Sequence, residues 1–132
     1  MLDKEKYKHT EITEKIIKAY YAVYNQLGYG FLEKVYENSM AIELRKLNLK
    51  VELQQSIRVY YDGKEVGFYV ADMIVEDCVI IELKAAESLC EENEAQLTNY
   101  LRATDIEVGL LFNFGKEAEF KRKAFSNEYK NR

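Results

Sequence analysis

The chain has 132 residues, of which 48% are hydrophobic and 32% are charged, which is typical of a globular protein and not of a disordered one. No apolar run approaches the roughly 20 residues of a membrane span, so no membrane partner is expected. A net charge of −4 argues against a protein that coats nucleic acid through bulk positive charge, but it allows an enzyme with an acidic metal site.

One domain covering residues 1–132 is expected, because the chain has no proline, no low-complexity stretch and no linker. The first residues are charged and lack the apolar stretch of a signal peptide. Cys78 and Cys90 show no metal-ligand spacing, so we interpret them as reduced thiols, with a disulfide as the alternative. These features together favour a cytoplasmic protein.

Two helices are predicted in the first third of the chain. Thr10 can cap the first, whose apolar residues recur at helical spacing as far as Leu27. Gly28 and Gly30 end this helix and permit a sharp change of direction. A second helix follows to about Leu47, with an apolar side made of Leu32, Val35, Tyr36, Met40 and Leu44.

From Val51 onward the apolar residues recur at every second position and no longer at helical spacing, which predicts strands. The first strand loses phase near Gln54-Gln55, and the turn signal Asp62-Gly63 separates it from a strand over 66–75. After Glu76-Asp77, a strand over 79–83 is almost entirely apolar, as expected of a strand buried on both faces.

One more helix and one more strand complete the predicted order. The helix covers 91–104, with Ala95, Leu97, Tyr100 and Leu101 inward, and an apolar strand follows over 108–112. The residues from Lys116 onward fit either an edge strand or a frayed helix. The order α-α-β-β-β-α-β predicts an α/β fold of the α+β type, a mixed sheet with helices packed on it.

Three charged residues, Asp72, Glu82 and Lys84, lie inside the two apolar strands on either side of Glu76-Asp77. A turn there places Asp72 opposite Glu82 or one step diagonal from it, and Glu82 and Lys84 share a strand face. Carboxylate oxygens are the ligands that Mg²⁺ prefers, and a neighbouring lysine can orient water or stabilise charge on a phosphate. The alternative is an ordinary charge cluster at a strand end, but burying three such groups without a role would be costly.

The same residues resemble the signature of the PD-(D/E)XK nuclease superfamily, an acidic residue on one strand and (D/E)-x-K on the next. Here the match is Asp72 and Glu82-Leu83-Lys84, with Ala71 where the signature usually has proline. The predicted element order also fits the restriction-endonuclease-like core of that superfamily. The resemblance implies Mg²⁺ or Mn²⁺ as cofactor, and a ligand from the Leu83 carbonyl.

More specifically, the chain resembles the GxxExxY protein family within that superfamily. Gly30-Phe31-Leu32-Glu33-Lys34-Val35-Tyr36 carries the naming motif. The similarity continues through residues 81–85, 94–101 and 109–115, and so extends over nearly the whole chain. One departure is Asn93, where members of the family often carry histidine before the Glu-Ala-Gln run.

The resemblance adds residues from two helices to the candidate site. Glu33 is implied as a third metal ligand; Glu37 lies one turn later on the same helical face, and either carboxylate could instead pair with Lys34. Gln96-x-x-x-Tyr100 is similar to an element of RecB-like nucleases that contacts the substrate backbone beside the metal. The spacing puts both groups on one helical face, and core packing is the alternative for Tyr100.

Other chemistry is disfavoured by what the chain lacks. Its one histidine, His9, lies in a polar N-terminal segment, and no glycine-rich phosphate loop is present. Eleven tyrosines could suggest base stacking, but their positions on apolar stripes favour core or sheet packing, as for Tyr20, Tyr36, Tyr60 and Tyr69.

The hypothesis that follows is a Mg²⁺- or Mn²⁺-dependent endo- or exonuclease. Asp72, Glu82, Lys84 and Gln96 would be its catalytic residues, Asp72, Glu82 and Glu33 its metal ligands, and Gln96 and Tyr100 its substrate contacts. Nucleic acid, DNA in particular, would be the partner, and a homodimer is left open. The rivals are an inactive nuclease-fold binding or scaffold module and a metal-dependent hydrolase of small phosphate compounds.

Overall fold

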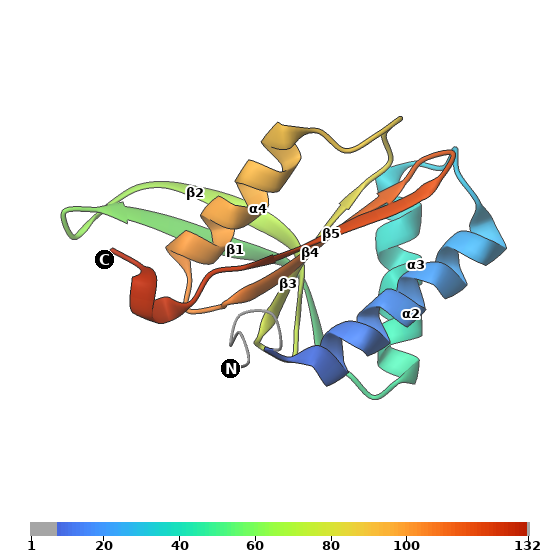
Figure 1. The fold of residues 1–132 in the computed structure, drawn as a ribbon, viewed down its shortest axis with the longest axis horizontal. Coiled ribbons are helices and arrows are strands. Elements are labelled where there is room, and N and C mark those ends of the chain that lie inside the picture. The colour runs from blue at the N-terminus through green and yellow to red at the C-terminus, as the bar shows by residue number, and fades with distance from the viewer. Residues whose placement is uncertain (1–7, 132) are drawn as a thin grey trace, which may run out of the picture.

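The computed structural model describes residues 8–131 (Figure 1). Helices α2 and α3 come first, then three strands, helix α4, two more strands and a short 3-10 turn. Their bounds are α2 Thr10–Leu27, α3 Glu33–Lys46, β1 Val51–Tyr61, β2 Lys64–Val75, β3 Val79–Lys84, α4 Glu91–Ala103, β4 Val108–Phe114, β5 Ala118–Ala124 and η1 Asn127–Tyr129. No helix within this part of the chain is long and apolar enough to cross a membrane.

The five strands form one mixed sheet in the order β1-β2-β3-β4-β5. β3 and β4 run parallel, and the crossover between them carries α4; the other neighbouring strands are antiparallel. This architecture confirms the predicted fold class. The residues after Lys116 were expected to form either an edge strand or a frayed helix. They form the edge strand β5, which pairs with β4 from Val108 to Phe114.

Helices cover both faces of the sheet, which creates two cores. α2 and α3 pack on one face and α4 on the other (Figure 1). Along β3, Ile81 and Leu83 belong to the core under α2 and α3, whereas Ile80 belongs to the core under α4. Both faces of β3 are therefore buried, and this explains its nearly unbroken apolar sequence.

Two tight hairpin turns fix the registers of β1, β2 and β3. Asp62 and Gly63 have φ angles of 52° and 75°, and Glu76 and Asp77 have φ angles of 51° and 56°. Positive φ at both central residues is the signature of turns whose twist matches a right-handed hairpin. The turns predicted at both places are confirmed.

Several local predictions were wrong. The residue that precedes α2 as its N-cap is His9, and Thr10 is the first residue of the helix. On α3, Leu32 is 81% exposed because it comes just before the helix and outside its packed stripe, and Val35 is exposed as well. Ala95 faces solvent on α4. Tyr60 and Tyr69 are also exposed, because the β1–β2 hairpin extends past the cores.

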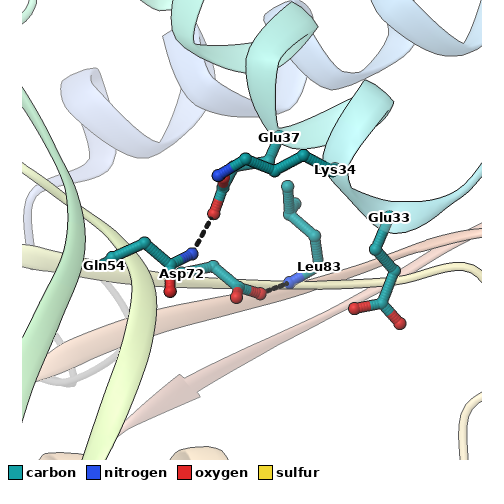
Figure 2. A pocket seen from close by; sticks show the side chains of 6 residues that line it. All are labelled: Glu33, Lys34, Glu37, Gln54, Asp72 and Leu83. Atoms are coloured by element: carbon teal, nitrogen blue, oxygen red, sulfur yellow. Dashed lines mark hydrogen bonds and ion pairs between the residues drawn. The ribbon is translucent and has the colours of Figure 1, made fainter.

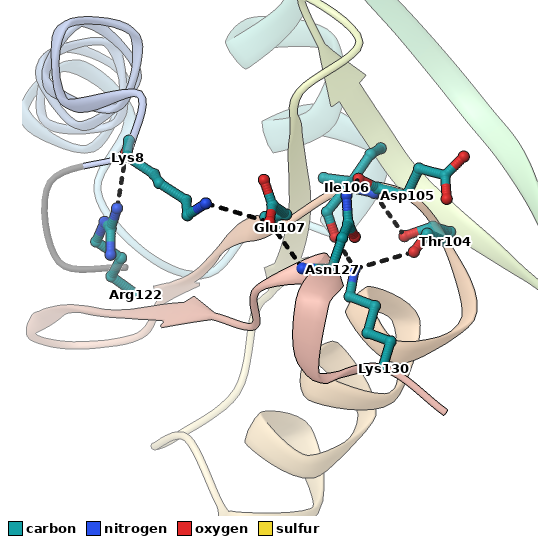
Figure 3. Close-up of polar contacts among 8 residues, drawn as sticks. All are labelled: Lys8, Thr104, Asp105, Ile106, Glu107, Arg122, Asn127 and Lys130. Atoms are coloured by element: carbon teal, nitrogen blue, oxygen red, sulfur yellow. Dashed lines mark hydrogen bonds and ion pairs between the residues drawn. The ribbon is translucent and has the colours of Figure 1, made fainter. Parts of the chain in front are cut away.

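The C-terminal segment is held against the loop that follows α4. The Lys130 ammonium donates to the carbonyl oxygens of Thr104 and Ile106, at 2.9 and 2.8 Å, and the Asn127 side chain donates to the carbonyl of Asp105 at 2.9 Å (Figure 3). The Asn127 backbone N–H donates to Glu107 at 2.7 Å. These bonds satisfy the backbone carbonyls of an irregular loop and fix the end of the chain beside α4.

Candidate functional site

β2 and β3 separate where Asp72 faces Glu82. Their backbone pairing runs from Val75 and Val79 to Met73 and Ile81 and then stops. One step further, the backbone N–H of Asp72 donates to the Glu82 carboxylate at 2.8 Å. The backbone N–H of Leu83 donates to the Asp72 carboxylate at 2.7 Å. Two carboxylates thus replace the missing carbonyl acceptors, and this exchange fixes both side chains at the point of separation.

Both carboxylates are in surroundings that disfavour negative charge. Glu82 is only 4% exposed, and burial, followed by the charge of Asp72, raises its pKa to about 8. Burial also raises the pKa of Asp72, and the charges of Glu37 and Glu33 act in the same direction. Because Glu82 is shielded from water and the charge of Asp72 repels it, the pair favours a bound proton or a bound cation.

Lys84 lies close enough to this pair to counter its charge, since its ammonium lowers the pKa of both Asp72 and Glu82. The side chain is half-buried. Among residues 8–131, the ammonium makes no hydrogen bond or ion pair of its own. The structure therefore brings together the three charged residues singled out in the strands and leaves the cation available to a ligand.

A cavity of about 170 Å³ opens beside Asp72, between the sheet and the start of α3 (Figure 2). Glu33 occupies the first position of α3 and is exposed. Its carboxylate lies apart from that of Asp72 in Figure 2, although both residues line the same cavity. The lining residues are Glu33, Lys34, Glu37, Gln54, Asp72 and Leu83.

Glu37 is buried and already has two partners. Its carboxylate accepts hydrogen bonds from the Lys34 ammonium and from the side-chain amide of Gln54. The ion pair with Lys34, one of the two interpretations of this residue, is therefore present. Gln54 was not predicted as a site residue, but its φ of 52° interrupts β1 and accounts for the loss of phase in the sequence. The break in the alternation of apolar residues near Gln54 was the feature of the sequence that could have indicated this residue.

The residues Gly30 and Tyr36 of the GxxExxY motif shape the approach to α3. Gly30 has a φ of 109°, a conformation that residues with a Cβ rarely adopt. The Tyr36 hydroxyl donates to the Gly28 carbonyl at 2.7 Å and accepts from the Phe31 N–H at 3.1 Å, while its ring stacks on Phe114 with centroids 4.0 Å apart. The motif thus fixes the loop that delivers Glu33 to the cavity.

Helix α4 brings Tyr100 to the other side of the carboxylate pair. Tyr100 is buried, and burial, followed by the charges of Glu82 and Asp72, raises its pKa to about 12. Gln96 is half-buried one turn earlier, and its side chain makes no hydrogen bond within residues 8–131. Asn93 accepts hydrogen bonds from the Cys90 N–H and thiol, at 3.1 and 3.2 Å, and so stabilises the start of α4.

The loop that follows Lys84 is fastened by a residue that was not predicted. The Asn113 side chain accepts from the Ala86 N–H and donates to the Ala86 carbonyl, both at 2.9 Å, and it is almost fully buried. An asparagine at the end of an otherwise apolar strand was the available signal, since a buried amide needs partners. Cys78 and Cys90 form no disulfide, in agreement with the interpretation as reduced thiols.

The structure does not assemble all the predicted metal ligands into one group. Among residues 8–131 no cluster of three His, Cys, Asp or Glu side chains is arranged to hold a metal ion. Asp72 and Glu82 lie together, with Lys84 beside them, and Glu33 stands across the cavity. A cation bound here would have two protein carboxylates close at hand, which is the number that Mg²⁺ often takes from a protein.

Known proteins resemble this chain in family and in fold. The family model of the PD-(D/E)XK nuclease superfamily matches residues 10–123. One solved structure, the crystal structure of SSO0001, is similar to this chain with a TM-score of 0.56 and 21% sequence identity. The similarity covers 89% of this chain and 59% of that chain, so this chain spans less than two thirds of that chain's length. A search of curated proteins gave no match.

Proposed function

The chain belongs to the PD-(D/E)XK nuclease superfamily, and from that premise we propose that it is a divalent-metal-dependent nuclease. Nucleic acid is the substrate class that the superfamily implies. We assign the chain more finely to the GxxExxY family, because Gly30, Glu33 and Tyr36 are present: Glu33 lines the cavity, and Gly30 and Tyr36 shape the loop that leads to it. DNA is the proposed substrate and Mg²⁺ or Mn²⁺ the proposed cofactor.

The observation that carries the proposal is the exchange of hydrogen bonds between Asp72 and the Glu82–Leu83 segment. It holds the buried carboxylate of Glu82 beside the half-buried one of Asp72; the pKa values of both are raised, and neither forms an ion pair with a lysine or arginine among the described residues. Two adjacent carboxylates without an ion-pair partner offer the hard oxygen donors that a divalent cation prefers. Asp72 and Glu82 would hold it, with Glu33 and the Leu83 carbonyl as further ligands.

A divalent cation at this place would supply Lewis acidity and lower the pKa of a water molecule. The chain's own residues would do the rest. The Lys84 ammonium, which makes no hydrogen bond or ion pair among residues 8–131, would orient the attacking water or stabilise charge that develops on the phosphate. The Tyr100 hydroxyl keeps its proton at neutral pH and can donate to a phosphate oxygen, and Gln96 on the same helix would contact the substrate backbone.

The proposal is tested by incubating the purified protein with end-labelled DNA and RNA oligonucleotides, single-stranded and duplex, in Mg²⁺ or Mn²⁺. We expect metal-dependent cleavage of DNA that EDTA abolishes. Mononucleotides and other small phosphate compounds serve as parallel substrates, and exclusive hydrolysis of these would indicate a small-phosphate hydrolase. Intact oligonucleotides under every condition, with no metal bound in a calorimetric Mn²⁺ titration, would favour the scaffold module.

A further inference from the structure

A second and larger cavity lies on the α4 side of the sheet, away from the start of α3. It has a volume of about 480 Å³ and is enclosed by the β1–β2 hairpin, α4 and the C-terminal segment. The residues that give it chemical character are Val59, Tyr60, Tyr69, Asn99, Arg102 and Asn131. We call this cavity the hairpin groove.

The sheet is distorted so that aromatic groups face this groove. Successive residues of a regular strand point to opposite faces, yet Val59 and Tyr60 both line the groove. The register of β1 on β2 shifts between these two residues, and such a bulge re-aims a side chain. Tyr60 is 60% exposed and Tyr69 51% exposed, so two aromatic rings are open to a ligand.

The groove also contains groups for polar recognition. Arg102 is exposed and lies over the ring of Phe125, with its guanidinium carbon 5.3 Å from the ring centroid. It forms no ion pair with a carboxylate anywhere in residues 8–131. With no carboxylate partner, this guanidinium can complement an anion such as a phosphate. Asn99 adds an amide that can both donate and accept.

The far wall of the groove is held rigidly. Asn131 follows the residue Lys130, whose ammonium bonds to the carbonyls of Thr104 and Ile106 (Figure 3). Asn127 adds its bond to the carbonyl of Asp105. The segment that closes the groove is therefore anchored before any ligand arrives, which reduces the ordering cost of binding.

The groove is linked to the carboxylate pair through Tyr100, although the two cavities share no lining residue. Tyr69 packs against Tyr100, with ring centroids 5.7 Å apart. Tyr100 in turn lies close enough to interact electrostatically with Glu82 and Asp72. Tyr69 is therefore one aromatic contact away from Tyr100, the residue beside the carboxylates, so the open rings of Tyr69 and Tyr60 lie on the flank of that site.

We propose that the hairpin groove binds an unpaired nucleobase next to the scissile phosphate. Tyr60 and Tyr69 stack on the base, Asn99 contacts its edge, and Arg102 binds the adjoining phosphate. The inference rests on the proposed nuclease function and narrows its substrate to nucleic acid with a single-stranded segment at the cleavage site. Bases in an intact duplex are stacked on each other and cannot present their faces to tyrosine rings.

The test is fluorescence anisotropy with a labelled single-stranded oligonucleotide and a blunt duplex of the same sequence, in EDTA so that no cleavage occurs. Tyr60→Ala combined with Tyr69→Ala should weaken binding of the single strand roughly tenfold or more. Tyr61→Ala is the matched control, since Tyr61 is 76% exposed on the same hairpin but does not line the groove. Its single-strand affinity should stay within about twofold of the wild type.

A second measurement tests Arg102. Arg102→Gln should reduce the dependence of log affinity on log salt concentration for the single strand by about 0.7, the share of one phosphate contact. All these side chains are exposed, so circular dichroism and thermal unfolding should match the wild type.

Three outcomes overturn the inference in distinguishable ways. If the wild type cleaves oligonucleotides while the double tyrosine variant binds and cleaves as well as it does, the groove assignment is wrong and the nuclease proposal stands. If the wild type neither binds nor cleaves any oligonucleotide, the proposed function fails and the groove assignment fails with it. If sedimentation shows a dimer that the tyrosine variant loses while nucleic-acid binding is unchanged, the hairpin is a self-association surface instead.

Discussion

The hydroxyl of Tyr36 donates to the carbonyl of Gly28 across a distance of 2.7 Å and accepts from the Phe31 N–H at 3.1 Å. One side chain thus satisfies two backbone groups in the loop between α2 and α3. The ring itself stacks on Phe114 at the end of β4. Tyr36 therefore ties the loop that carries Gly30 to the core, and the position of Glu33 depends on that tie.

Replacing Tyr36 by phenylalanine should separate the two roles of this side chain. Tyr36→Phe keeps the ring on Phe114 but leaves the Gly28 carbonyl and the Phe31 N–H without their partner, so we expect a loss of about 1–2 kcal/mol in the free energy of unfolding. Tyr36→Ala removes the ring as well and should cost about 3–5 kcal/mol. Urea denaturation monitored by circular dichroism measures both. Equal losses for the two variants would contradict the assigned hydrogen bonds.

A side chain at Gly30 should destabilise the protein, although there is space for one. A Cβ at this position would meet nothing within 4 Å, so any penalty comes from the backbone φ of 109°. Gly30→Ala should therefore lower the free energy of unfolding by about 1–3 kcal/mol. Gly67→Ala is the control, because Gly67 also has open space but no positive φ. A Gly30→Ala protein as stable as the Gly67→Ala protein would show that the loop adopts another conformation.

Glu82 should make the metal-free protein less stable as the pH rises. Its pKa is about 8 in the folded state and 4.5 ordinarily, so between these values the folded state holds a proton that the unfolded state has released. Stability then falls with rising pH across this window. Glu82→Gln removes the effect while its amide oxygen can still accept from the Asp72 N–H. We expect the free energy of unfolding of this variant to rise relative to that of the wild type as the pH increases from 4.5 to 8, by a few kcal/mol in total.

The difference in stability between the Glu82→Gln variant and the wild type, measured by urea denaturation in EDTA from pH 5 to 8, checks this prediction. Glu43→Gln is the control, since Glu43 forms an exposed ion pair with Lys46 and should show little pH-dependent difference. A Glu82→Gln advantage that stays constant or shrinks as the pH rises would show that Glu82 is ionised in the metal-free protein.

Asn113 should support the loop that follows Lys84. Asn113→Ala leaves the N–H and the carbonyl of Ala86 without their partner, so we expect a loss of about 2–4 kcal/mol in the free energy of unfolding. Asn38→Ala, at an exposed position of α3, should change stability by no more than about 0.5 kcal/mol. Chemical denaturation of both variants provides the comparison. An Asn113→Ala protein that matches the control would mean that the loop is held by other contacts.

The sequence was sufficient to predict the order of the elements as far as β4 and to place Asp72 opposite Glu82 or one step diagonal from it. Both predictions depend on short-range rules: the period of the apolar residues, and a tight turn at Glu76-Asp77 that sets the register between β2 and β3. The nearly unbroken apolar run at 79–83 likewise predicted that this strand is buried on both faces. Local chemistry decided these features, so local patterns could reveal them.

Features set by long-range geometry could not be predicted in this way. The bulge at Val59–Tyr60 and the length of the β1–β2 hairpin determine that Tyr60 and Tyr69 project past the cores, and nothing in the alternation of residues indicates where a core ends. Glu37 takes its second partner, Gln54, from β1, and Asn113 bonds to Ala86 in the loop that follows β3. The separation of Glu33 from Asp72 depends on how α3 sits on the sheet.

The central claim is that Asp72, Glu82 and Lys84 form the site of phosphodiester hydrolysis. The most direct test is the single-turnover rate of oligonucleotide cleavage in Mn²⁺ by the wild type, by Asp72→Asn and by Lys84→Met, with folding checked by circular dichroism. We expect each variant to fold and to cleave at least about 10²-fold more slowly than the wild type. Cleavage by the Asp72→Asn, Lys84→Met double variant at a rate within a few-fold of the wild type would contradict the claim.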